Sequence, residues 1–219
     1  MNYWIFKLIK IGITGGTGIL GRNLIKFIKL KTNYKIIKYK NNILNKKKVN
    51  IWVKKNQFNI IIHLAAIVPT SLAKKKFIFS KNVNFIGTKY LVNAINAHQI
   101  RKNLLFFSST SHVYSFLNRK INESEPTKGV SLYGKTKILA ENYILNNCKS
   151  YDFCIGRISS LVSEEQDSNY VLKKIIHKCK KDKKITFGNS NIKRNFIYVD
   201  DVSKIIIKIL RKKIVGIIN

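Results

Sequence analysis

Short apolar runs alternate along this chain with longer stretches in which apolar residues recur every three or four positions. The first kind of stretch predicts buried strands, and the second predicts helices that bury one face. The expected strands cover Lys10–Thr14, Tyr34–Tyr39, Asn59–Leu64, Leu104–Ser108, Phe153–Ile158 and Val215–Ile218. The expected helices cover Gly18–Leu30, Val49–Lys55, Val83–His98, Leu132–Asn147, Tyr170–Lys180 and Val202–Arg211. This order predicts an α/β fold with a doubly wound parallel sheet.

The length of the chain suits a single hydrophobic core. Its 219 residues are 45% hydrophobic and contain neither repeats nor a long linker, so we expect one domain over residues 1–219. The most turn-rich segment runs from Tyr114 to Ser131 and is a candidate lid or substrate loop. Lysines interrupt every apolar run near membrane length, which favours a cytoplasmic protein with no membrane partner.

The net charge of +32 would ordinarily point to nucleic acid. However, Ile, Lys and Asn dominate the composition, as expected from an A- and T-rich genome, and no basic motif is interleaved with aromatic residues. A solvated lysine surface is therefore favoured over a nucleic-acid interface. Because no Asp or Glu precedes Glu123, the first half of the chain should still attract ligands that carry phosphate. The cysteines Cys148, Cys154 and Cys179 lack a metal-ligand spacing, so we expect incidental thiols and no metal.

A glycine-rich turn follows the first expected strand and opens the first expected helix, in the sequence Gly15-Gly16-Thr17-Gly18-Ile19-Leu20-Gly21. Such glycines let the backbone turn tightly and approach a pyrophosphate, which then meets the free N–H groups at the start of the helix. Glycines at a tight turn can also be purely structural. Their position between a strand and a helix favours a dinucleotide site.

The second strand bears on which dinucleotide is bound. Sites that prefer NAD usually carry an acidic residue about 20 residues after the glycines, where it binds the ribose 2′-hydroxyl. Here the strand ends in Lys38-Tyr39-Lys40. A lysine such as Lys40 would attract a 2′-phosphate, so NADP is favoured over NAD. The alternative is that both lysines only reflect a lysine-rich composition.

A candidate acid–base pair lies on the helix expected at Leu132–Asn147. Tyr133 and Lys137 are four residues apart and so share one helix face. The lysine ammonium can stabilise the tyrosine phenolate, which can then exchange a proton with an alcohol during hydride transfer. A surface tyrosine and lysine at this spacing would be the simpler interpretation.

Several further motifs occur in the order typical of one enzyme family. They are His63-Leu64-Ala65-Ala66, Asn84-Phe85-Ile86-Gly87-Thr88, Ser108-Ser109-Thr110-Ser111-His112-Val113-Tyr114 and Arg194-Asn195-Phe196-Ile197-Tyr198-Val199-Asp200. Together with the glycines and the Tyr133–Lys137 pair, they make the chain resemble the extended short-chain dehydrogenase/reductases, also called the NAD-dependent epimerase/dehydratase family. The resemblance runs from about Lys10 to the C-terminus and implies a Rossmann-type fold.

The resemblance also implies roles for individual residues. Thr110 would bind the substrate oxygen, Tyr133 would be the acid or base, and Lys137 would lower the tyrosine pKa and hold the nicotinamide ribose. Asn84 would support the lysine or the cofactor, and Arg194 would bind the diphosphate of a nucleotide sugar. The glycine turn with Leu64, Ala65 and Ala66 would hold the cofactor. A homodimer through the helices at Val83–His98 and Leu132–Asn147 is a further expectation.

The reaction is narrowed by two departures from the family. The 4,6-dehydratases carry Asp-Glu after the catalytic threonine, whereas Ser111 and His112 stand here, which disfavours dehydration. The short segment from Lys40 to Ile60 resembles that of 4-keto sugar reductases, in which His112 could act as an extra acid in epimerisation before reduction. A UDP-glucose 4-epimerase-like enzyme, which needs only Thr110, Tyr133 and Lys137, is the alternative. A non-catalytic dinucleotide- or RNA-binding protein also stays open. Residues 159–196 are expected to form a small C-terminal substrate lobe, which looks truncated beside the family.

Overall fold

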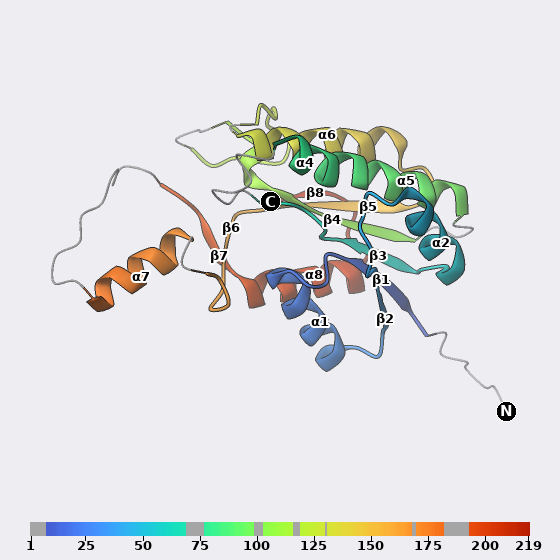
Figure 1. Ribbon diagram of the computed structural model, residues 1–219, viewed down its shortest axis with the longest axis horizontal. Helices are drawn as coiled ribbons and strands as arrows, with labels where there is room; N and C mark the ends of the chain where they lie inside the picture. The colour runs from blue at the N-terminus through green and yellow to red at the C-terminus, as the bar shows by residue number, and fades with distance from the viewer. Residues whose placement is uncertain are drawn as a thin grey trace.

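The computed structural model describes residues 8–68, 77–98, 103–115, 119–129, 131–167, 170–181 and 193–219. Within these ranges six strands form one sheet, in the order β2-β1-β3-β4-β5-β8, and all neighbouring strands are parallel (Figure 1). The strands are β1 (Lys10–Thr14), β2 (Lys35–Lys38), β3 (Ile60–His63), β4 (Leu104–Thr110), β5 (Asp152–Ile158) and β8 (Gly216–Ile218). The predicted doubly wound α/β fold is confirmed. The order reverses between β1 and β3, where such sheets bind ligands beyond the carboxyl ends of the strands.

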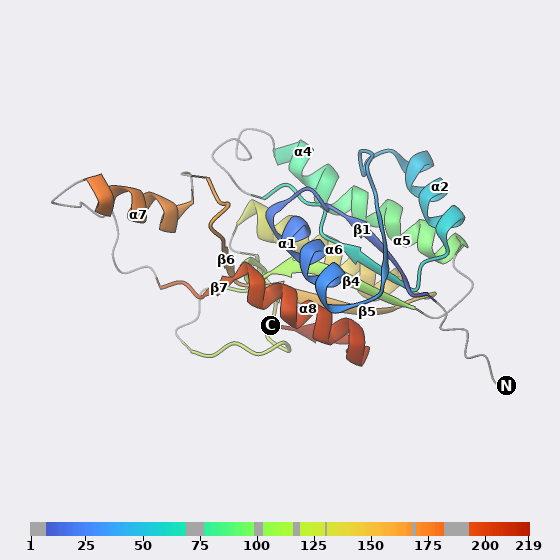
Figure 2. The same ribbon diagram turned by 90° about the horizontal axis from the view of Figure 1, so that it is seen from below.

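Helices cover both faces of this sheet (Figures 1 and 2). Helices α1 (Ile19–Lys31) and α8 (Val199–Lys212) pack together on one face. Helices α2 (Lys46–Asn56), α5 (Gly87–His98) and α6 (Leu132–Asn147) lie on the other. A short helix, α4 (Phe77–Lys81), leads into α5 through a π-helical turn at Asn82–Ile86, where the sequence predicted one continuous helix.

The core consists of two layers because side chains alternate along each strand. Ile60 and Ile62 face α1 and α8, whereas Ile61 between them faces α2 and α5. The same alternation separates Phe106 from Phe107 on β4. Both layers are closed by helix residues that are fully buried, including Leu24 and Ile28 on α1 and Leu91, Val92 and Ile95 on α5. The carboxyl ends of β1, β3 and β4 are thereby held as one rigid edge.

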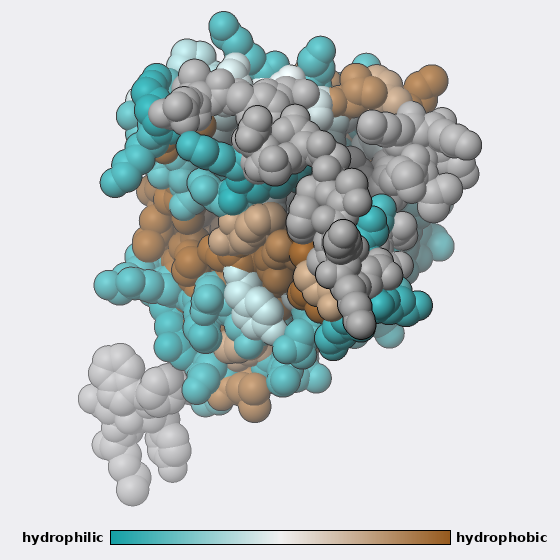
Figure 3. Space-filling view, turned by 90° about the vertical axis from the view of Figure 1, so that its left-hand side faces the viewer, coloured by the Kyte–Doolittle hydropathy of each residue, from teal (hydrophilic) through white to brown (hydrophobic). Residues whose placement is uncertain are grey.

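A second, smaller unit lies at one end of the molecule (Figure 1). Its strands β6 (Ser160–Val162) and β7 (Phe196–Tyr198) pair in parallel, and helix α7 (Val171–Lys181) comes between them in the chain. This is the segment expected to form the substrate lobe, although its strands were not predicted; residues 168–169 and 182–192 of it lie outside the described residues. Helix α7 buries no residue. Figure 3, which faces this end, shows apolar surface at its centre bordered by hydrophilic residues.

The observed ends of some strands and helices differ from the predicted ends, because polar residues extend them. Strand β4 runs to Thr110 and not Ser108. Helix α8 starts at Val199, three residues early, because β7 ends at Tyr198 and the carboxylates of Asp200 and Asp201 suit the positive end of a helix. Parts of the predicted lid, residues 116–118 and 130, are outside the described residues. Within the described part of the chain, no helix is both long and apolar enough to cross a bilayer.

Candidate active site

The turn after β1 is built to let a ligand approach the backbone closely. Gly15 adopts a φ of +71°, and a Cβ there would stand 2.5 Å from the backbone nitrogen of Ala65. A Cβ on Gly21 would collide with the carbonyl oxygen of Gly15. Helix α1 then begins at Ile19 with no acidic residue in its first turn. This cradle fits a pyrophosphate, because the free N–H groups of the helix start face it without a competing negative charge.

A chain of buried hydrogen bonds holds the neighbouring end of β3. The Thr88 hydroxyl donates to the Asn84 carbonyl at 2.7 Å, so the His63 Nε2, 2.9 Å from that hydroxyl, must be the donor to it. His63 Nδ1 then accepts from the Thr14 hydroxyl at 2.6 Å, and Thr14 accepts from the Ala65 N–H at 3.3 Å. Burial, helped by the charge of Lys137, lowers the pKa of His63 to about 3. His63 is therefore a neutral structural residue that links β1, β3 and α5.

Asn84 connects the same region to α6. It lies in the π-helical turn, and its side chain accepts from the Ile67 N–H at 2.7 Å and donates to the Ile67 carbonyl at 3.1 Å. It also donates to the Thr136 hydroxyl at 3.0 Å, and Thr136 donates to the carbonyl of Tyr133 at 2.8 Å. Local π-helical widening is common at functional sites. Here it lets Asn84 tie the segment that follows β3 to α6.

Tyr133 and Lys137 lie in the first two turns of α6. The helix is capped by the Ser131 hydroxyl, which accepts from the Gly134 N–H at 3.0 Å. Thr110, the last residue of β4, accepts from the backbone N–H of His112 at 3.3 Å. Its own hydroxyl proton stays available to a substrate oxygen. A strand end and a helix start thus present the three polar groups that the sequence assigned to catalysis.

The charges of these groups are controlled by burial. Lys137 is 2% exposed, and burial lowers its pKa to about 7 although Glu141 opposes this. The Lys137 Nζ lies 4.4 Å from the centre of the Phe107 ring, a favourable cation–π distance. Burial raises the pKa of Tyr133, and Tyr170 raises it further. The phenol therefore holds its proton until a positive charge is placed beside it.

One cavity of about 630 Å³ unites these groups, a volume typical of small-molecule sites. Most of the predicted site residues line it. They are Gly15, Gly18, Ile19, Leu20, Gly21, Leu64, Ala66, Thr110, His112, Tyr133, Lys137 and Arg194. The cavity also receives residues of the small unit that the sequence did not single out, namely Gln166, Tyr170, Val171, Leu172 and Phe196. Only their place in the expected substrate lobe hinted at such a role.

The remaining predicted residues lie outside the lining of this cavity. Thr17 is exposed, and its carbonyl accepts from Arg22. Ala65 and Asn84 do not line the cavity but hold its neighbours, through the bonds of Ala65 to Thr14 and of Asn84 to Ile67. Lys40 is exposed beyond the end of β2. The side chain of Lys38 is nearer to the glycine turn, since its Cδ lies 3.3 Å from the point where a Cβ on Gly16 would be. Lys38 is therefore better placed than Lys40 to meet a ligand bound at the glycine turn.

His112 stands between α6 and the small unit. Its ring is 6.2 Å from the Tyr133 ring in an edge-on orientation, and its Nδ1 is 3.4 Å from the Ser131 hydroxyl. Burial, followed by the charge of Arg194, lowers the pKa of His112. Arg194 itself is exposed and lines the cavity. An electropositive group thus borders the side of the cavity formed by the small unit.

The sequence model of the NAD dependent epimerase/dehydratase family matches residues 11–219. The chain belongs to this family. Among its relatives, this epimerase/dehydratase-family chain is 29% identical over 213 residues to the GDP-6-deoxy-D-talose 4-dehydrogenase of Aggregatibacter actinomycetemcomitans, covering 94% of this chain and 71% of that protein. It is 28% identical over 215 residues to the dTDP-D-glucose 4,6-dehydratase of Homo sapiens, covering 96% and 59%.

Solved structures show the same fold. A dTDP-4-dehydrorhamnose reductase from Clostridium acetobutylicum has a TM-score of 0.81 at 23% identity, covering 95% of this chain and 72% of that one. A UDP-glucose 4-epimerase from Thermus thermophilus, in complex with NAD, has a TM-score of 0.81 at 17% identity, covering 96% and 77%. The chain spans about 56% to 71% of the length of the curated dehydratases and dehydrogenases that it matches.

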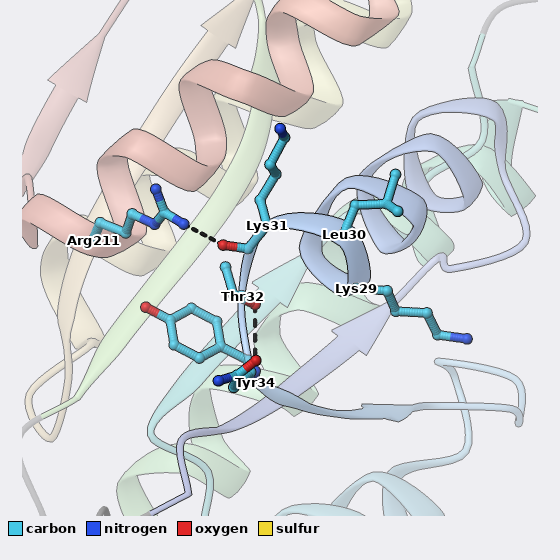
Figure 4. A pocket seen from close by; sticks show the side chains of 7 residues that line it. Lys29, Leu30, Lys31, Thr32, Tyr34 and Arg211 are labelled. Atoms are coloured by element: carbon cyan, nitrogen blue, oxygen red, sulfur yellow. Dashed lines mark hydrogen bonds between the residues drawn. The ribbon is translucent and has the colours of Figure 1, made fainter.

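A second hollow, of about 420 Å³, lies at the end of α1 (Figure 4). Arg211 of α8 donates to the carbonyl of Lys31 across it, and the backbone N–H of Tyr34 donates to the Thr32 hydroxyl at 3.3 Å. Its lining holds no carboxylate, histidine or cysteine. The Arg211 bond joins α8 to α1, and we assign the hollow a structural role.

Proposed function

We propose that this chain is an NAD(P)-dependent enzyme that reduces or epimerises a nucleotide-linked sugar, most simply at a 4-keto carbon, through a Thr110–Tyr133–Lys137 site. One observation carries the proposal: these three side chains line the same cavity as Gly15 and Gly18. Hydride and proton transfer require a dinucleotide site and an acid–base group in one enclosure. The family membership of the chain supports the same class of chemistry.

In the proposed mechanism each residue handles one atom of the reacting alcohol or ketone. The glycine turn would hold the pyrophosphate of the cofactor, Tyr133 and Lys137 would hold its nicotinamide ribose, and the bound nicotinamide would supply or accept the hydride. Thr110 donates a hydrogen bond to the sugar oxygen, and Tyr133 gives that oxygen a proton in reduction or takes one in oxidation. The Lys137 ammonium lowers the phenol pKa from its raised value, so that the proton can move near neutral pH.

We favour NADP over NAD as the cofactor. No Asp or Glu occurs between β2 and Glu123 that could bind the ribose hydroxyls, and Lys38 lies beside the glycine turn. A lysine there attracts a 2′-phosphate. The solved relatives include both a complex with NAD and a complex with NADP, so direct binding must decide. Equal affinity for NADPH and NADH would contradict the preference.

Reduction is favoured over dehydration, and 4-epimerisation is the alternative. Ser111 and His112 follow Thr110 where 4,6-dehydratases carry carboxylates, so the acid–base groups that eliminate water are missing from this turn. In the reductase, the position of His112 beside Tyr133 supports a role as an additional acid in an epimerisation that precedes reduction, whereas a 4-epimerase needs only Thr110, Tyr133 and Lys137. Arg194 on the same side of the cavity is suited to the diphosphate of the substrate.

The test is to incubate the purified chain with NADPH or NADH and a panel of 4-keto nucleotide sugars. Oxidation of the cofactor supports the reductase, and isomerisation without net oxidation supports the epimerase. Tight retention of RNA without turnover would instead support a non-catalytic binding protein.

A further inference from the structure

A buried ion pair lies directly behind the catalytic residues. Glu141 of α6 and Arg157 of β5 have side chains that are only 2% and 4% exposed. Arg157 donates to the Glu141 carboxylate from Nη2 at 2.8 Å and from Nε at 3.2 Å. The Ser109 hydroxyl donates to the other carboxylate oxygen. The carboxylate is thus held from β4 and β5 at once.

The carboxylate and its partner Ser109 both lie next to catalytic groups. Ser109 precedes Thr110 on β4, and Glu141 follows Lys137 by one helical turn, so Tyr133, Lys137 and Glu141 share one face of α6. The far side of Arg157 turns away from the site, where it donates to the Tyr114 hydroxyl at 2.6 Å and to the Glu123 carbonyl at 3.1 Å. Glu141 is therefore the end of the ion pair that faces Lys137.

The surroundings of the Lys137 ammonium offer it little other compensation. The Phe107 ring of β4 faces the ammonium, and His63 of β3 is neutral, its pKa being lowered further by the charge of Lys137. Tyr133, one turn earlier on α6, holds its proton. Among the described residues, Glu141 is the group whose charge works against the burial of Lys137.

We propose that Glu141 is a positioning residue, clamped by Ser109 and Arg157, that fixes the spacing between β4 and α6 and keeps Lys137 in its charged form. A buried ion pair is by itself a poor source of stability, because removing two charges from water offsets their attraction. The position of the Glu141–Arg157 pair next to Thr110 and Lys137 indicates instead a role in positioning these two residues. Removal of the carboxylate takes away the negative charge that opposes the burial of the ammonium, which favours loss of its proton.

The experiment is an NMR titration of protein labelled with 13C-lysine, from about pH 5 to pH 11. In the native protein one lysine signal has a midpoint near neutral pH, and the same signal is missing from Lys137→Met. In the double variant Glu141→Gln/Arg157→Met, which removes both charges and so leaves neither unpaired, the midpoint falls by at least about half a pH unit. The control Asp201→Asn/Lys204→Met removes an exposed ion pair on α8 and leaves the midpoint unchanged.

Circular dichroism first establishes that each variant is folded. A second variant, Glu141→Asp, keeps both charges but draws the carboxylate back by one methylene, and it shifts the midpoint in the same direction by less. An unchanged midpoint in whichever of these variants folds would overturn the proposal. The inference rests on the proposed role of Lys137, but the titration needs no turnover. An inactive protein with the expected shift therefore counts against the proposed function alone.

Discussion

Replacing Lys137 with methionine should make the protein more stable and inactive. The lysine is almost fully buried, and its pKa is about 7 against an ordinary value of 10.5. Each pH unit of this difference is worth about 1.4 kcal/mol, so holding the charged form costs the native state roughly 5 kcal/mol. Methionine fills a similar volume without a charge, although it forgoes the cation–π contact with Phe107, worth roughly 1–2 kcal/mol.

The sign of the pH dependence follows from proton binding. Between about pH 7 and pH 10.5 the unfolded chain keeps the lysine proton that the native state releases, so native stability rises with pH across this range. The cost is fully present below about pH 7. At pH 6, Lys137→Met should therefore unfold at a higher urea concentration than the native protein, and its free energy of unfolding should be larger by a few kcal/mol. This difference should shrink as the pH approaches 10.

Urea unfolding at several pH values, with extrapolation to zero denaturant, measures the effect. The matched control is Lys135→Met, which removes an exposed lysine from the same helix and should change stability by less than about 0.5 kcal/mol at every pH. A Lys137→Met protein that is less stable than the native one at pH 6, or a stability difference that does not vary with pH, would refute this reasoning.

Three further predictions follow from the site. Gly15→Ala should weaken NADPH binding at least tenfold in a fluorescence titration, because its Cβ meets the Ala65 backbone; Gly216→Ala, whose φ is +95° but whose Cβ meets nothing, should leave binding intact. His112→Asn should slow proton exchange at C3 or C5 of the sugar, and full retention of that exchange would remove the acid role. Exposed apolar side chains on α4 and α6, such as Phe79 and Leu139, predict a dimer in solution-mass measurements, whereas a monomer at all concentrations would contradict it.

Local patterns in the sequence were sufficient for the sheet and for most of the site. The unbroken apolar run Ile60-Ile61-Ile62 reflects burial on both faces, and the glycine turn needs only neighbouring residues to specify it. The spacing of Tyr133 and Lys137 likewise depends on one helix, so it predicted correctly that both share a face. These features are encoded within a few residues of one another.

Features that depend on distant residues were missed. Strands β6 and β7 are three residues long and pair across more than thirty residues, so neither has a periodic signal of its own. The Glu141–Arg157 pair joins a helix to a strand, and its only sequence signal is that Glu141 extends the four-residue spacing of Tyr133 and Lys137. The preference for Lys38 over Lys40 depends on which side chain lies beside the glycine turn, and composition alone cannot distinguish them.

The most direct test of the account compares the native chain with Tyr133→Phe, which loses one hydroxyl at the proton-transfer position. Product formation from 4-keto nucleotide sugars or UDP-glucose is measured with NADPH or NADH, and cofactor affinity is measured in parallel. We predict that the rate falls by about a hundredfold or more and that cofactor affinity falls by much less, because Lys137 and the glycine turn still hold the cofactor. Equal rates in the two proteins, or no product from the native chain with any of these substrates, would contradict the claim that Tyr133 and Lys137 form a catalytic pair.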